Sequence, residues 1–141
     1  MITATVREAI TDARMIVLGP GDLYTSTIAA LLPHGMQEAI AASSAKLVYI
    51  LNLFTKAGQT EGYTAMQHVM EVERYAGRKI DVVLASTNGY PADSISHYAK
   101  EGEYPIVDDL DTDPRVRRLP LASVRGDADT RRGRIRGPHP E

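Results

Sequence analysis

Cysteine is absent from the 141 residues of this chain. Disulfides, thiolate metal ligands and cysteine nucleophiles are therefore excluded, and nothing points to an oxidising compartment. No apolar run approaches the ~20 residues that a membrane-spanning helix needs, and the N-terminus has no apolar segment of signal-peptide type. We therefore expect a cytoplasmic protein with no membrane partner.

Several catalytic and nucleotide-binding motifs are also missing. The chain has neither the Gly-Lys-Ser/Thr of a P-loop nor the three spaced glycines of the dinucleotide fingerprint. Ser26 does not stand in a nucleophile elbow, and no histidine or carboxylate lies at metal-ligand spacing around His68. We predict no catalytic residue and no metal, and we expect His68 to be structural.

The charge is divided unequally along the chain. Residues 1–113 carry 15 acidic and 8 basic side chains, whereas residues 114–141 carry 8 arginines and 3 acidic residues. The second segment has too little apolar area to offset the entropy of ordering it, so we expect residues 114–141 to form a disordered basic tail. Nucleic-acid binding by this tail is the weaker interpretation, because the acidic body offers no supporting basic face.

Residues 1–113 alternate between helical and strand patterns. The spacing places Met66, Val69 and Met70 on the buried face of one helix, with Gly77 as its C-terminal cap. Strands rich in Val, Ile and Leu between helices predict an α/β fold with a mainly parallel sheet. We expect helices at 5–13, 23–32, 36–42, 64–75 and 93–100, and strands at 15–18, 46–53, 79–86 and 104–108.

Ligands of such sheets bind beyond the carboxyl ends of the strands. Three loops are predicted at that edge, namely 19–26, 52–64 and 86–93, and they are rich in hydroxyl, amide and glycine residues. Asn52 offers donors and acceptors for a base or a ribose hydroxyl. The convergence of these loops predicts a ligand site.

The first loop joins the strand at Met15–Leu18 to a helix through Gly19-Pro20-Gly21. Unpaired N–H groups at a helix start favour an anion, and Thr25 and Ser26 can add hydroxyls. The alternative is a plain turn in which both glycines supply positive φ. A carboxylate beside a phosphate repels it, so Asp22 is expected either to meet a sugar hydroxyl or a cation or to cap the helix.

The loops also resemble a known family. The match begins with Gly19-Pro20-Gly21-Asp22-Leu23-Tyr24-Thr25-Ser26 and extends in order to about residue 110. These residues resemble the gluconeogenesis-factor branch of the 2-phospho-L-lactate transferase-like superfamily. The remaining matched residues are Leu31-Leu32-Pro33, Glu38-Ala39-Ile40, Val48-Tyr49, Asn52, Thr55, Gly58, Thr60, Gly62-Tyr63-Thr64, His68-Val69, Tyr98-Ala99, Glu101-Gly102 and Pro105.

The resemblance implies a three-layer α/β/α Rossmann-like fold and proteins that often self-associate. Family members begin with a glycine-rich strand, loop and helix that have no counterpart here, so we expect residues 1–113 to be the C-terminal portion of a nucleotide-sugar-binding domain, without its N-terminal strands. A fragment of this kind should expose a strand edge and an apolar face, and we expect it to self-associate.

Two functions follow from the resemblance. The first is a non-enzymatic, UDP-sugar-binding regulator of carbon metabolism, cell-wall synthesis and cell shape, with no cofactor. The second is a phospholactyl transferase with a deazaflavin acceptor, a guanosine diphosphate donor and a divalent metal. The family's Pro-Gly-Glu-Thr is here Ala57-Gly58-Gln59-Thr60, and its acidic residue before the histidine is Gln67, which favours the regulator.

Under the regulator hypothesis the diphosphate lies on the first loop, at Gly19, Gly21, Thr25 and Ser26. The ribose or the base then contacts Asn52, Thr55 and Thr60. The full set of predicted ligand-binding residues is Gly19, Pro20, Gly21, Asp22, Tyr24, Thr25, Ser26, Asn52, Thr55, Gly58, Thr60 and Gly62.

Overall fold

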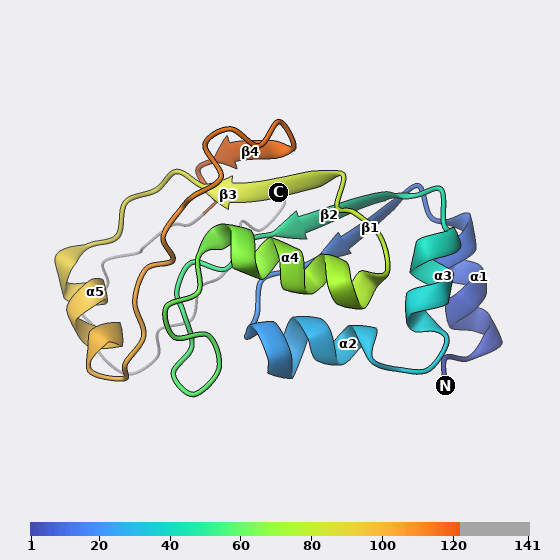
Figure 1. The fold of residues 1–141 in the computed structure, drawn as a ribbon, viewed down its shortest axis with the longest axis horizontal. Coiled ribbons are helices and arrows are strands. Elements are labelled where there is room, and N and C mark those ends of the chain that lie inside the picture. The colour runs from blue at the N-terminus through green and yellow to red at the C-terminus, as the bar shows by residue number, and fades with distance from the viewer. Residues whose placement is uncertain (122–141) are drawn as a thin grey trace, which may run out of the picture.

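A computed structural model of the chain describes residues 1–121. Its centre is a sheet of four strands, all parallel, in the order β1-β2-β3-β4. The strands point toward helix α5, so the loops that follow them lie at that end of the molecule (Figure 1). The predicted α/β fold with a parallel sheet is confirmed. The strands are β1 (Met15–Leu18), β2 (Lys46–Ile50), β3 (Val82–Ser86) and β4 (Val116–Leu119).

The helices begin and end close to the predicted positions. Helix α4 starts with a capping box, in which Thr64 and Gln67 each bond to the other's backbone N–H, and it ends at Gly77 with φ 72°. Both boundaries follow from local sequence signals. The helices are α1 (Ala4–Asp12), the π-helix η1 (Leu23–Ile28), α2 (Ala29–Leu31), α3 (Met36–Ala42), α4 (Ala65–Ala76) and α5 (Ala92–Ala99).

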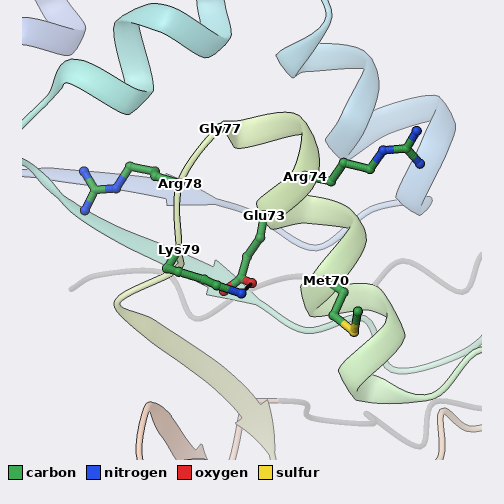
Figure 2. Close-up of a pocket in the computed structure, with 6 residues that line it drawn as sticks. All are labelled: Met70, Glu73, Arg74, Gly77, Arg78 and Lys79. Carbon is green, nitrogen blue, oxygen red and sulfur yellow. Dashed lines mark hydrogen bonds and ion pairs between the residues drawn. The ribbon is translucent and has the colours of Figure 1, made fainter.

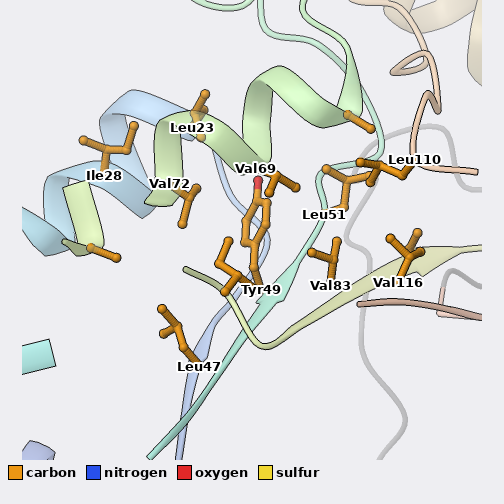
Figure 3. Packing of buried hydrophobic residues seen from close by; sticks show 14 of the residues in the cluster. Leu23, Ile28, Leu47, Tyr49, Leu51, Val69, Val72, Val83, Leu110 and Val116 are labelled. Carbon is orange, nitrogen blue, oxygen red and sulfur yellow. The ribbon is translucent and has the colours of Figure 1, made fainter. Parts of the chain in front are cut away.

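The core lies between the sheet and α4 (Figure 3). Tyr49 of β2 is fully buried at its centre and points from the sheet toward the helix. Val69 and Val72 pack on it from α4. The expected burial of Met70 is wrong, since its side chain is 58% exposed. It lies about 100° around the helix from Val69 and so falls outside the buried stripe.

The opposite face of the sheet is open at β1. Met15 and Val17 alternate with Ile16 and Leu18, which pack against the core. Met15 and Val17 themselves are 58% and 51% exposed. Because β1 is also the first strand in the sheet order, its outer edge is unpaired within residues 1–121.

The last strand does not lie at residues 104–108, where the sequence pattern predicts it. Residues 104–108 form only two isolated bridges, Phe54 with Pro105 and Thr64 with Val107. The fourth strand is β4, inside the segment predicted to be a tail, and it pairs with β3. Arg115, directly before β4, forms ion pairs with Glu73 and Asp113, which neutralise its charge. The rest of the predicted tail, from residue 122, lies outside the described residues.

Candidate functional site

Three loops lie at the carboxyl edge of the sheet. They follow β1, β2 and β3, which run parallel, so the loops meet at one end of the molecule (Figure 1). The first and second loops are joined directly, because the Asn52 side chain donates a hydrogen bond from Nδ2 to the Gly21 carbonyl oxygen. The second and third are joined by the rings of Phe54 and Tyr90, 4.8 Å apart. The structure thus brings the three predicted loops together.

Gly21 is required by close approach and not by its backbone angle. A Cβ at this position would lie 3.0 Å from the Ser26 Cβ, tighter than ordinary contact. Gly19 has nothing within 4 Å of the equivalent point. Neither glycine has positive φ, so the alternative interpretation, a plain turn in which both glycines supply positive φ, is wrong. The chain is instead folded tightly back onto η1.

Asp22 begins η1 through its backbone. Its carbonyl accepts from the N–H groups of Ser26 (2.9 Å) and Thr27 (3.1 Å), the second being a bond of π-helix type. Its side chain makes no capping bond, contrary to the expected capping role, and instead accepts from the Thr25 hydroxyl at 3.4 Å. Thr25 and Ser26 are both exposed. Short π-helical turns occur frequently at functional sites.

Tyr24 faces helix α4. Its hydroxyl lies 3.0 Å from the hydroxyl of Tyr63 and donates to Glu71 Oε2 at 3.3 Å. The bond with Tyr63, followed by burial and the Glu71 charge, raises the pKa of Tyr24. Tyr24 therefore ties the first loop to the second loop and to α4.

Thr55 and Thr60 are buried in the second loop. The Thr55 hydroxyl accepts from the Tyr104 N–H at 3.0 Å, and the Thr60 hydroxyl accepts from the Lys56 N–H at 2.8 Å. Their residues are 5% and 1% exposed. In this structure the two hydroxyls hold the loop in shape, and neither faces open solvent.

The two predicted glycines of this loop have a backbone conformation that favours glycine. Gly58 and Gly62 have φ of 77° and 71°, a left-handed conformation that side chains rarely adopt. The Gly58 N–H donates to the carboxylate of Glu61. Glycine is therefore explained here by backbone conformation.

Lys56 lies in the second loop but is not among the ligand-binding residues predicted from the sequence. Its Nζ lies 2.5 Å from Glu103 Oε1, and the two side chains are 38% and 8% exposed. The Glu103 bond raises the pKa of Lys56, and the charges of Asp22 and Glu101 add to the effect. The signal was present in the sequence, since Lys56 is the only basic residue in the three loops.

His68 is fully buried in α4, as expected of a structural residue. Its Nδ1 lies 2.9 Å from the Thr64 carbonyl oxygen, so Nδ1 carries the proton. Burial lowers the pKa of His68, which keeps the ring neutral. Within residues 1–121 its Nε2 has no hydrogen-bond partner, and no group of three metal-ligating side chains could hold an ion.

Two surface hollows lie away from these loops. The larger, of about 380 Å³, is at the C-terminal end of α4, where Lys79 extends beside Glu73 (Figure 2). The smaller, of about 180 Å³, is lined by residues of α2, α3 and Tyr75. Neither is lined by a predicted ligand-binding residue. Across residues 1–121, no helix combines the length and the apolar character needed to cross a membrane.

The parallel sheet and its carboxyl-edge loops define an α/β protein of Rossmann-like type. The family model of 2-phospho-L-lactate transferase CofD matches residues 1–127. The chain belongs to this CofD family.

Curated relatives carry a different name. The chain is 44% identical over 105 residues to a gluconeogenesis factor of Halalkalibacterium halodurans, covering 72% of this chain and 32% of that protein. It is 34% identical over 105 residues to the gluconeogenesis factor of Bacillus subtilis, covering 74% and 33%. The chain thus spans about a third of the length of these relatives.

A solved structure supports the fold. A crystal structure of a UPF0052-family protein from Bacillus halodurans superposes with a TM-score of 0.79 at 33% identity, covering 86% of this chain and 41% of that one. The sequence resemblance to the gluconeogenesis-factor branch and the Rossmann-like fold are both confirmed.

Proposed function

We propose that this chain forms one wall of a nucleotide-sugar site in a regulator of gluconeogenesis-factor type, with a UDP-sugar as the ligand. One observation carries the proposal. The Asn52–Gly21 bond holds two ligand-type loops together at the carboxyl edge of adjacent parallel strands. Membership of the CofD family and similarity to proteins named gluconeogenesis factor support it.

The exposed part of the first loop is assigned to the diphosphate. Gly19, Thr25 and Ser26 are exposed, and Gly21 is partly exposed. Lys56 supplies a cation, and its ammonium keeps N–H donors free after bonding Glu103. Asp22 suits a ribose or sugar hydroxyl, because a carboxylate accepts from O–H groups and repels phosphate.

The second loop plays two parts in this proposal. Asn52 is half-buried at the loop junction, where its amide can also reach the ribose or the base. Thr55 and Thr60 are buried in backbone bonds, so we assign them to shaping the loop. The residues that touch the ligand are then those of the first loop together with Asn52 and Lys56.

Calorimetry tests the ligand. The purified chain is titrated with UDP-N-acetylglucosamine, with GDP and with buffer, and a saturable heat with the UDP-sugar alone is the expected result. A Lys56→Met variant should bind more weakly, while Lys100→Met, on the C-cap of α5, serves as the matched control. Because the chain forms one wall of the proposed site, we expect weaker binding than by a full-length relative, and the gluconeogenesis factor of Bacillus subtilis is titrated in parallel. Absence of heat with every nucleotide in both proteins contradicts the proposal.

We also propose a cellular role, which similarity to proteins named gluconeogenesis factor supports. We assign the chain to a cytoplasmic, non-enzymatic regulator of carbon metabolism, cell-wall synthesis and cell shape. A strain lacking the gene should grow poorly on gluconeogenic carbon sources and recover when the gene is returned. Normal growth and normal cell shape on such media would exclude this role.

A phospholactyl transferase is the second candidate, favoured by the name of the matching family model. It predicts product formation from a deazaflavin acceptor and a guanosine diphosphate donor with a divalent metal. Turnover in that assay, together with heat from GDP but not from the UDP-sugar, identifies the transferase.

For assembly, we propose that copies of the chain associate through the open face of the sheet at β1. Met15 and Val17 project there from an unpaired edge strand. An exposed strand edge with apolar side chains pairs readily with another chain.

A further inference from the structure

Tyr49 places a hydroxyl group beneath the candidate site. The residue is 0% exposed, and its ring crosses the core from β2 toward α4 (Figure 3). Its hydroxyl donates to Asn52 Oδ1 at 3.3 Å. Burial raises the pKa of Tyr49, so the hydroxyl keeps its proton and acts as a donor. A polar group at this depth needs such a partner.

The Gly21 carbonyl oxygen determines which way the Asn52 amide is turned, because it can only accept, whereas a tyrosine hydroxyl can donate or accept. The Tyr49 hydroxyl bonds the amide oxygen and holds the amide in this place. An asparagine amide has an accepting oxygen on one side and a donating nitrogen on the other. With Oδ1 on the Tyr49 hydroxyl, Nδ2 faces the Gly21 carbonyl oxygen and donates to it. The reversed amide would set two carbonyl oxygens against each other. One orientation therefore satisfies both neighbours.

The Asn52 amide in turn fixes the peptide between Gly21 and Asp22. In a trans peptide the C=O and the following N–H point in opposite directions. Because the Gly21 carbonyl points to Asn52, the Asp22 N–H points away from it. Within residues 1–121 no acceptor is paired with this N–H.

The residue after this peptide is held by η1. The Asp22 carbonyl accepts from the N–H groups of Ser26 at 2.9 Å and Thr27 at 3.1 Å. Gly21 lies against Ser26, since a Cβ added at Gly21 would lie 3.0 Å from the Ser26 Cβ. The Gly21–Asp22 segment is therefore held by Asn52, from the loop after β2, and by the first hydrogen bonds of η1.

We propose that Tyr49 is a positioning residue of the candidate site: acting through Asn52, it holds the Gly21–Asp22 peptide so that the Asp22 N–H is presented to an oxygen of the ligand. The inference deepens the proposed function and rests on it for the identity of the ligand. The chemistry required is an accepting oxygen, as on a phosphate, since the group presented is a donor.

Two variants test this relay, by which we mean the action of Tyr49, through Asn52, on the Gly21–Asp22 peptide. Tyr49→Phe removes the hydroxyl and keeps the ring, while Asn52→Asp keeps the shape and removes the donor to Gly21. Tyr75→Phe is the matched control, since Tyr75 is a partly buried tyrosine on α4 that packs against the same core. The readouts are calorimetry with UDP-N-acetylglucosamine, the NMR signals of the Asp22 N–H and the Asn52 side-chain NH₂, and the melting temperature.

We expect Tyr49→Phe to bind the UDP-sugar about fivefold more weakly and Asn52→Asp about tenfold or more, with Tyr75→Phe unchanged. In both relay variants the Asp22 amide signal should shift while the fold is retained. Should Tyr49→Phe fail to fold, the Asp22 amide signal of Asn52→Asp decides the question, because Asn52 is also assigned to the ligand and its affinity alone does not separate the two roles.

The outcomes separate the two proposals. Absence of binding by both the unaltered chain and the full-length relative contradicts the UDP-sugar site, and the NMR signals then decide the relay alone. If the Asp22 and Asn52 signals of Tyr49→Phe match those of Tyr75→Phe, the relay is wrong. Equal affinity of Asn52→Asp and the unaltered chain also overturns it.

Discussion

Arg115 Nη1 lies 2.5 Å from Glu73 Oε1, which joins the segment leading into β4 to helix α4. Glu73 also accepts from Lys79 at 2.6 Å and from the Ile80 N–H at 3.1 Å. The carboxylate is buried, and these three donors satisfy it. The same arginine bonds Asp113 at 2.7 Å. This cluster anchors an arginine-rich strand on an otherwise acidic domain.

Replacing Glu73 with Gln should destabilise the fold strongly. The amide cannot match the charged bonds to Arg115 and Lys79, and Arg115 loses one of its two carboxylates. We expect a loss of about 3 kcal/mol in the free energy of unfolding, measured by urea denaturation. Glu8→Gln, on the exposed surface of α1, is the control. Equal midpoints for the two variants would show that the cluster contributes nothing.

Stability should fall in acid. Burial raises the pKa of Glu73, but the bonds from Lys79 and Arg115 lower it further, so its net pKa lies below the ordinary 4.5. A carboxyl with a lowered pKa in the folded state stabilises the fold above its unfolded pKa, and this contribution is lost as the pH falls through the folded value. Melting temperatures should therefore drop below about pH 4.5. The melting temperature of Glu73→Gln should drop less steeply with falling pH than that of the unaltered chain. Parallel curves of melting temperature against pH for the two proteins would show that Glu73 is not the cause of the acid sensitivity.

Gly21→Ala should weaken ligand binding, because the added Cβ meets Ser26 at 3.0 Å and pushes the first loop outward. We expect about a tenfold loss of UDP-sugar affinity and a stability cost of about 1 kcal/mol, measured by calorimetry and urea denaturation. Gly89→Ala, in the third loop and with nothing within 4 Å of the added Cβ, is the control and should bind normally. Similar affinities for both variants would show that the close packing of Gly21 is unimportant.

Val17→Glu should reduce self-association. The charge would lie on the open face of β1, where Val17 is 51% exposed, and burying it between two copies would be costly. Sedimentation velocity should show a shift toward monomer. Leu32→Glu, at a 61% exposed position at the end of α2, is the control and should leave the assembly unchanged. A monomeric unaltered chain would rule out association by this face.

Much of the fold could be predicted from local sequence. The capping box at Thr64 and the C-cap at Gly77 depend on residues within one helical turn, so helix α4 was placed almost to the residue. The alternation of apolar strands with helices predicted the parallel sheet. Met70 was misplaced because the period of a helix does not reveal which neighbouring stripe a sheet will cover.

The sequence by itself therefore determined the order of the elements, the three loops at one edge and the family. Only the tertiary structure decided that β4 lies at Val116–Leu119, that Lys56 pairs with Glu103, and that Asn52 connects Tyr49 to Gly21. The physical reason is the distance along the chain. Lys56 and Glu103 are 47 residues apart and Asn52 and Gly21 are 31 apart. Whether such groups meet depends on strand order and register, which are set by packing the whole core and not by any local pattern.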